Sequence, residues 1–340
     1  MNEETKSPLS VLVLSLESFI VQLKGISEGN EESSKTDFIL VDETELARQL
    51  GALADTISHE STKFSMVFTD EAAPSAQTSE SLSNRLIGMS AALFKTVVSL
   101  PVDQVGTYYR QSVVDAVVDV FRSVSSLAAA AKEGSDNTKA QLKETGTIWE
   151  SCDRLKAIPK NSREVLLRII GDTLSMVSDA FSEMQEITNE ANNSFAEEPE
   201  DLLDDERHAL TGTEILRLNS CSQLVKAAKA TLTKTRITVE QSPTEPKSTV
   251  RADDQLSTLV SRVSPLVDNV VSLFHENELD SKALDDEVTK LHDGVKSVLD
   301  AFRTTPYYQE GMHSKWMDVL CTAVQHNLAK YHGSNESASK

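Results

Sequence analysis

Glycine and proline are scarce in this sequence, which contains 12 and 9 of them among 340 residues. Strand-rich folds need a turn about every 8–12 residues, and those turns rely on Gly, Pro, Asn and Asp. Hydrophobic residues make up 39% of the chain and charged residues 25%, which is enough apolar material for real cores. The scarcity of turn residues therefore predicts long helices, and the length predicts about two domains.

Basic residues are also in the minority, because 33 Lys and Arg stand against 53 Asp and Glu and give a formal charge of −20. This balance argues against a general affinity for DNA or RNA, since phosphate contacts need clustered Lys and Arg. The densest basic segment runs from Lys226 to Arg236, beside Leu224 and Leu232. We interpret it as a solvated helix face, with a nucleic-acid contact as the alternative.

Cysteine is rare, and Cys152, Cys221 and Cys321 lack the CxxC or CxxH spacing of metal sites. This pattern predicts buried free thiols in a reducing compartment. The seven histidines are spread out, and His292 and His326 lie among apolar helical positions that suggest half-buried structural roles. Because no P-loop, G-x-S-x-G or G-x-G-x-x-G motif occurs either, we expect no metal, no cofactor and no catalysis, with an all-helical enzyme as the alternative.

No uninterrupted hydrophobic run is long enough for a membrane span. The most apolar stretch, LSVLVLSLESFIVQL, contains Glu17 and Gln22 and is followed by Lys24. It has neither a basic leader nor a small-residue cleavage site. We expect it to be a core helix of a cytosolic or nuclear protein.

Apolar residues recur at helical spacing in ten segments of the chain. Three of these segments begin with a polar residue followed three positions later by Glu, which is the signature of a helix start. These pairs are Asp42 with Glu45, Asn161 with Glu164, and Thr211 with Glu214.

Prolines mark other helix ends. Pro8 suits a first helical turn, and Pro101 stops a helix that begins near Thr78. The next helix is expected over residues 103–131. A later pattern, from Leu256 to Phe274, should be kinked or split at Pro265.

The fold class that we predict is all-α, with about ten helices in two packed antiparallel bundles. The expected organisation is an N-terminal bundle over residues 1–191, an acidic linker over 192–210, a C-terminal bundle over 211–332 and a disordered tail over 333–340.

The acidic linker contains the stretch FAEEPEDLLDDERHALTG, with seven carboxylates between Glu197 and Glu206. It lacks the spacing and the glycine of a calcium loop. A solvated joint is the favoured interpretation, and the alternative is a contact with a basic partner that includes a short leucine docking motif. The candidate contact residues are Glu197, Glu198, Glu200, Asp201, Leu202, Leu203, Asp204, Asp205 and Glu206.

Four Ser-Pro or Thr-Pro pairs are candidates for proline-directed kinases, at Ser7, Ser242, Ser264 and Thr305. Ser242 is the best placed, because it lies in a predicted flexible joint. Ser264 and Pro265 suit an N-cap and a first helical residue equally well.

Several segments together resemble the cyclin-D1-binding protein family. The clearest is IWESCDRLKAIPKNSREVLLRIIGDTLSMVSDAFSEMQEI, from Ile148 to Ile187, with Trp149, Cys152 and the Ile158-Pro159 pair before a long helix. Further matches are SLPVDQVGTYYRQSVVDAVVDVFRSV, SCSQLVKAAKATLTKTR, RVSPLVDNVV and WMDVLCTAVQHNL. It is the ordered series, over residues 42–331, that carries the resemblance.

The resemblance implies a non-enzymatic protein that binds D-type cyclins and helix-loop-helix transcription factors and restrains cell-cycle progression. It also implies a location in cytoplasm and nucleus. From the acidic charge balance and the interrupted apolar stretch, we expect neither nucleic acid nor membrane as a direct partner. The bundles look like those of vinculin and α-catenin in architecture alone. A vinculin-like scaffold and an uncharacterised helical enzyme are the alternative functions.

Overall fold

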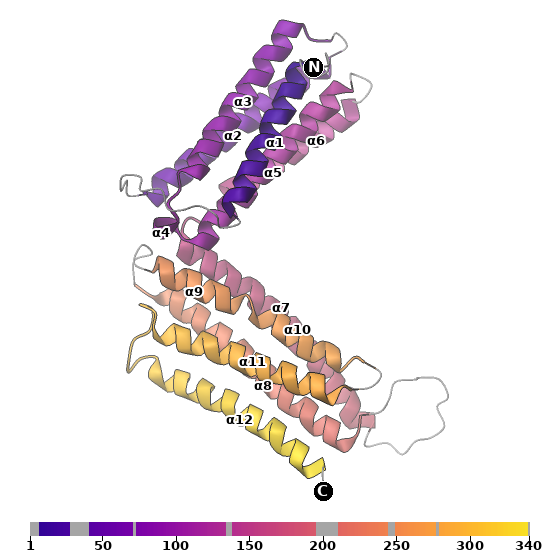
Figure 1. The fold of residues 1–340 in the computed structure, drawn as a ribbon, viewed down its shortest axis with the longest axis vertical. Coiled ribbons are helices and arrows are strands. Elements are labelled where there is room, and N and C mark those ends of the chain that lie inside the picture. Colours follow the sequence, from indigo (N-terminus) through magenta and orange to yellow (C-terminus); the bar gives the residue numbers. More distant parts are fainter. Residues whose placement is uncertain are drawn as a thin grey trace, which may run out of the picture. The chain divides into compact units, whose positions relative to one another are not determined.

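The computed structural model describes residues 7–27, 41–70, 73–133, 138–194, 210–243, 249–276 and 279–338. These residues form helices joined by turns and loops, and no strand occurs among them, which confirms the all-α prediction. The chain divides into two compact units, Met1–Val165 and Leu166–Lys340. Figure 1 labels the helices, and each unit is described by itself below.

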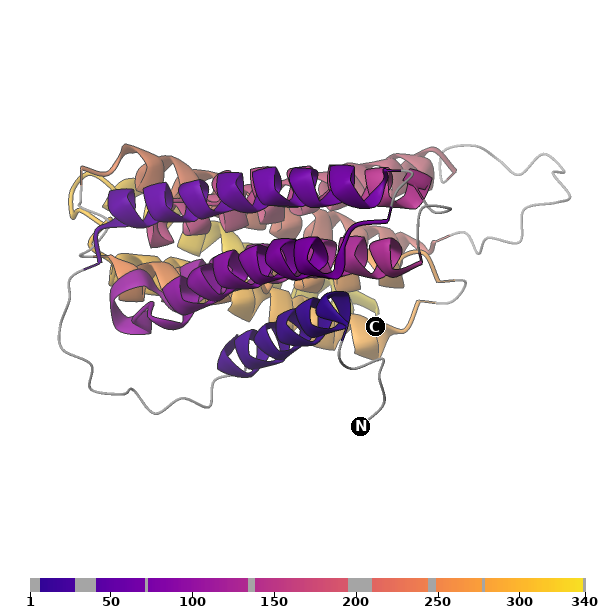
Figure 2. The same cartoon turned by 90° about the horizontal axis from the view of Figure 1, so that it is seen from above.

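The first unit is a bundle in which the helices run side by side (Figures 1 and 2). Its elements are α1 (Pro8–Ser27), α2 (Glu43–Phe68), α3 (Ala76–Val98), α4 (Val102–Val105), α5 (Thr107–Lys132) and α6 (Thr138–Lys156). Helix α5 packs chiefly against α1 and α6, and α2 packs chiefly against α6 and α3. Helix α1 packs against α3 and α5.

The second unit is also a bundle. It contains most of α7 (Ser162–Ser194), then α8 (Gly212–Gln241), α9 (Val250–Val260), α10 (Val263–Leu273), α11 (Ser281–Arg303) and α12 (Ser314–Ala338). Helix α11 packs against α9, α10, α8 and α12, while α12 packs chiefly against α8. One continuous core joins side chains of all these helices.

The boundary between the units differs from the one that we expected at residue 191. Leu166, Ile170, Val177 and Met184 of α7 belong to the core that α8 to α12 form. The apolar stripe of α7 was visible in the sequence, but a stripe does not say which helices cover it. The expected linker, 192–210, begins with the end of α7, and its residues 195–209 lie outside the described residues. The expected disordered tail, 333–340, is helical through Ala338.

The three predicted helix starts are confirmed. Thr211 accepts a hydrogen bond from the Glu214 N–H, and the Glu214 carboxylate accepts one from the Thr211 N–H, which completes a capping box. Asn161 accepts from the Glu164 N–H at 3.0 Å. Asp42 caps α2 in the same way.

The part of the chain that the structure describes has twelve helical elements, whereas we predicted ten helices, and two breaks account for the difference. The predicted helix 103–131 is interrupted at Gly106, whose φ of 89° ends α4 and suits glycine alone. The predicted kink at Pro265 falls earlier, at Ser261 and Arg262, and Pro265 lies within the first turn of α10. Proline is accepted there because the first helical N–H groups have no partner within the helix.

Candidate interaction surfaces

Side chains of the types that can bind metals or act in catalysis are scattered through the described part of the chain. Within it, no group of three or more His, Cys, Asp or Glu side chains could hold a metal ion. The three cysteines have free thiols, and burial raises the pKa of the Cys152 thiol to about 11 and also raises the pKa of Cys221. Such thiols are poor nucleophiles because the thiolate is rare at neutral pH.

The two histidines that we expected to be half-buried differ in exposure. His292 is buried on α11, and its Nδ1 lies 2.9 Å from Asp293 Oδ1, in agreement with a structural role. His326 on α12 is exposed, so the prediction was wrong for this residue. It lies two positions after the buried Val324, which is about 200° around a helix, and therefore points away from the core.

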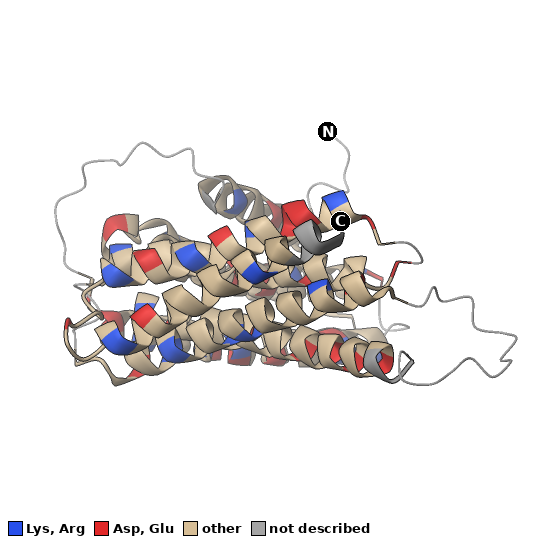
Figure 3. Cartoon of the chain, turned by 90° about the horizontal axis from the view of Figure 1, so that it is seen from below, with Lys and Arg blue, Asp and Glu red and all other residues tan. Residues whose placement is uncertain are grey.

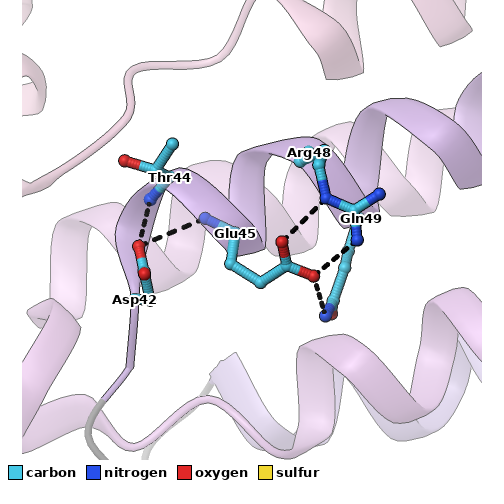
Figure 4. A network of polar contacts seen from close by, with 5 residues as sticks. All are labelled: Asp42, Thr44, Glu45, Arg48 and Gln49. Atoms are coloured by element: carbon cyan, nitrogen blue, oxygen red, sulfur yellow. Dashed lines mark hydrogen bonds and ion pairs between the residues drawn. The ribbon is translucent and has the colours of Figure 1, made fainter.

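A polar network surrounds the start of α2 (Figure 4). Asp42 accepts hydrogen bonds from the N–H groups of Thr44 and Glu45, at 3.0 and 3.2 Å. The Glu45 carboxylate accepts from Arg48 Nη2 at 2.6 Å and from Gln49 Nε2 at 2.9 Å. These bonds, with that of Arg48 the stronger, lower the pKa of Glu45 to about 2. Since all five residues belong to one helix start, the network caps α2 and forms no pocket.

The predicted partner contact lies outside the described residues. Its members, at positions 197, 198 and 200–206, fall between the end of α7 at Ser194 and the start of α8 at Gly212. The contact therefore stays a prediction.

Ser242 directly follows α8 and is half-buried, and its N–H donates to the Val239 carbonyl at 3.4 Å. Its phosphorylation stays a prediction. Ser264 and Thr305 are buried, so a kinase cannot reach their hydroxyl groups while the unit is folded. Ser264 is the second residue of α10 and does not cap the helix, because Arg262 occupies the N-cap position.

Helix α1 exposes apolar side chains along one side. By length and composition alone, residues 8–26 could cross a membrane, and only 22% of the apolar window is buried. Leu12 and Leu16 are buried in the first unit, as a core helix requires. Val11, Leu14 and Val21 are exposed, and their spacing of three and seven residues places them in one line, called here the α1 stripe.

A second exposed apolar surface of the first unit lies where α2 meets α6. Trp149 of α6 is about half-exposed, and its Nε1–H donates to Thr62 Oγ1 of α2 at 3.0 Å. Met66 of α2 and Leu142 of α6 are exposed as well. This surface contains Trp149, one of the residues that carry the family resemblance.

The second unit has a hollow between α8 and α12, called here the α8–α12 groove. Its lining residues are Ala230, Thr233 and Lys234 of α8 and Lys315, Trp316, Val319 and Leu320 of α12. Trp316 lies on the apolar stripe of α12, and Lys234 belongs to the basic segment. Sequence patterns indicated both features, but 82 positions separate these two residues, and only the packing of α8 against α12 brings them together.

The charges around these surfaces are mixed. Figure 3 shows Lys and Arg in blue and Asp and Glu in red along the helices, with longer stretches of other residues between them. Lys226, Lys234 and Arg236 of the basic segment are exposed, as expected for a solvated face. Lys229 is half-buried, and its Nζ lies 5.6 Å from the centre of the Phe181 ring of α7.

Comparison of the sequence with known proteins finds relatives that cover most of the chain. The family model described as "Grap2 and cyclin-D-interacting, N-terminal" matches residues 49–190. A Danio rerio protein named as a cyclin-D1-binding protein 1 homolog is 28% identical over 319 residues, which is 90% of each chain. The chain is thus similar over most of its length to proteins named for cyclin D1 binding. This similarity confirms the resemblance that the ordered segments carry.

Further relatives extend the similarity across the whole fold. A Xenopus laevis homolog in the same family is 28% identical over 83% of this chain and 86% of its own length. The Bos taurus cyclin-D1-binding protein 1 is 23% identical over 89% of this chain and 87% of its own length. Each match is too long to fit within one unit, so the similarity to these proteins includes residues of both units.

Proposed function

We propose that this protein is a non-enzymatic adaptor that binds a D-type cyclin in cytoplasm and nucleus and thereby restrains cell-cycle progression. The observation that carries the proposal is the similarity to proteins named for cyclin D1 binding, which extends over 90% of both chains. Helix-loop-helix transcription factors are the second proposed class of partner. Partner helices or grooves are common contact modes for helical proteins of this kind.

The exposed apolar side chains support binding as the activity. The α1 stripe, Trp149 with its neighbours, and the α8–α12 groove are all on outer helix surfaces of their own unit. Tryptophan is enriched among residues that dominate binding energy at protein interfaces.

The direct test is isothermal titration calorimetry, in which a purified D-type cyclin is titrated into the purified full chain. We expect saturable binding with a Kd of about 1 μM or tighter, and a cyclin of another type serves as the control. Lack of saturation at about fifty times that concentration would contradict the proposal. The same titration with a helix-loop-helix domain tests the second partner separately.

The acidic stretch and Ser242 are proposed to modulate this binding. Changing the seven acids of residues 197–206 to Asn and Gln tests the stretch, and Ser242→Glu tests the phosphorylation site. If the stretch contacts the cyclin, neutralising its acids should weaken the affinity for the cyclin by about tenfold or more. Unchanged affinity for the cyclin would show that the acidic stretch is a linker and does not contact this partner.

A further inference from the structure

The α8–α12 groove has a volume of about 490 Å³ and a floor that the core holds in place. The Trp316 ring lies 5.7 Å from the Phe302 ring, centre to centre, and Leu320 is buried. Val319 faces outward, with 66% of its surface exposed. A preformed apolar floor with an exposed aliphatic residue is suited to binding, because little order has to be created on association.

Helices α8 and α12 run antiparallel along the groove. Arg217, near the start of α8, lies over the Tyr331 ring near the end of α12, at 5.9 Å. Ala230 and Lys234, later on α8, share the groove with Lys315 and Trp316 at the start of α12. A third helix can lie in the channel between two antiparallel neighbours, because side-chain ridges of one helix fit grooves of the next.

The rim of the groove is basic although the chain as a whole is acidic. Helix α8 contains five Lys and Arg but only two Glu, in a protein with a formal charge of −20. Among the described residues, no carboxylate lies within ion-pair distance of Lys234 or Lys315.

The nearby carboxylates are engaged elsewhere. Glu240 lies 4.0 Å from Arg236, and Asp318 lies 2.8 Å from Arg303 of α11. The two lysines that line the groove are therefore available to an acidic partner.

We propose that the α8–α12 groove binds an amphipathic helix of a partner protein, one whose apolar stripe is flanked by Asp or Glu. The apolar stripe would cover Val319 and Trp316, and the flanking carboxylates would meet Lys234 and Lys315. A nucleic acid suits the groove less well, because its floor is aliphatic as well as aromatic and the charge of −20 repels a polyanion. The proposal concerns the chemistry of the occupant and holds whether or not that partner is a cyclin.

The test uses two fluorescent peptides of about 18 residues with the same leucine stripe, one flanked by Glu and the other by Lys. Fluorescence anisotropy measures their binding to the full chain. We expect saturable binding of the Glu peptide and about tenfold weaker binding of the Lys peptide. In a Trp149→Phe background, Trp316 is the sole tryptophan, and its emission should shift at about tenfold lower concentration of the Glu peptide than of the Lys peptide.

Two variants locate the binding. Val319→Glu and the pair Lys234→Glu with Lys315→Glu should each weaken the Glu peptide about tenfold or more. The matched control is Val102→Glu in α4, because Val102 is also an exposed valine and belongs to none of the surfaces described above. This control should bind like the unmodified chain, and thermal unfolding checks that every variant is folded.

Four results would overturn the proposal. Equal affinity for both peptides would remove the role of charge, and full affinity in Val319→Glu would place the peptide elsewhere. Displacement of the Glu peptide by an oligonucleotide at similar concentration would make the groove a nucleic-acid site. A dimer in sedimentation that Val319→Glu dissociates would make a second copy the occupant.

Discussion

Glu60 of α2 is 9% exposed, and its carboxylate accepts hydrogen bonds from Lys63 Nζ at 2.8 Å and from Arg85 Nη1 at 3.4 Å. Asp253 of α9 is 1% exposed, and its carboxylate accepts from Tyr307 Oη at 2.6 Å and from Thr249 Oγ1 at 2.8 Å. Among the described residues, two cations thus bond to the buried Glu60 of the first unit, whereas two neutral hydroxyl groups donate to the buried Asp253 of the second.

The partners of the two acids also differ in contact with water. The side chains of Lys63 and Arg85 remain 42% and 60% exposed, so salt and pH can reach that cluster. Tyr307 and Thr249 are buried with Asp253. A surface ion pair contributes little and is screened by salt. A buried hydrogen bond contributes more to the free energy of unfolding, because removing one partner takes a hydrogen bond from a polar group that water cannot reach.

The largest expected effect is that of Asp253→Ala, which removes the acceptor of two buried hydroxyl groups. We expect the free energy of unfolding of the second unit to fall by about 2–4 kcal/mol. Denaturant unfolding of the Trp149→Phe background reports this unit through Trp316. In a Trp316→Phe background, the fluorescence of Trp149 in α6 reports unfolding of the first unit. The midpoint of that transition should not change. Equal losses in both signals would contradict separate anchoring of the two units.

Tyr307→Phe should have a smaller effect, because Asp253 keeps its bond to Thr249. We expect a loss of about 1–2 kcal/mol in the same denaturant measurement. The adjacent Tyr308→Phe is the control, since the Tyr308 hydroxyl bonds to Glu310 at the surface and its loss should change stability by about 0.5 kcal/mol or less. Equal losses in the two variants would show that burial of the hydroxyl is immaterial.

Glu60→Gln should cost the first unit about 1 kcal/mol or less at neutral pH and low salt. The hydrogen bond from Lys63, more than that from Arg85, lowers the pKa of Glu60. Its stabilisation is therefore complete above the ordinary Glu pKa of about 4.3 and is lost as the pH falls through the lower folded pKa.

The stability difference between the wild type and Glu60→Gln should accordingly vanish well below about pH 4. It should also shrink in about 1 M salt, where the Debye length is about 3 Å. Thermal unfolding across this range measures both trends. A difference that persists in acid would assign the effect to packing rather than charge.

The smallest expected effect is that of neutralising the seven acids of residues 197–206. Both units should keep their free energies of unfolding to within about 0.5 kcal/mol. Differential scanning calorimetry measures this, and a clear loss in either unit would mean that the stretch is part of its fold.

Local chemistry made much of the fold predictable. The capping pairs Asn161–Glu164 and Thr211–Glu214 lie where a polar acceptor precedes an apolar stripe, and the helices begin there. The break at Gly106 was missed, because a glycine within a periodic pattern does not reveal whether its φ is positive. The assignment of α7 to the second unit was also missed, because it depends on which stripes meet.

The surfaces were less predictable than the helices. The candidate partner contact at residues 197–206 rested on a run of acidic side chains with two leucines, and it stays a prediction because these residues lie outside the described part of the chain. The α8–α12 groove combines a basic run with part of an apolar stripe, each of which has an ordinary explanation by itself. These two features form one groove only through tertiary packing, which neither the periodicity nor the composition of the sequence reveals.

Because Cys152 and Cys221 are buried, each bundle contains a native thiol whose rate of alkylation reports how often that bundle opens. Cys152 lies in α6 of the first unit and Cys221 in α8 of the second, and both are screened from water. A thiol-reactive reagent can modify them only when the surrounding helices separate, so the alkylation rate at each position measures how often that bundle opens. Ligand protection can thus be assigned to one half of the protein by mass spectrometry, without any engineered label.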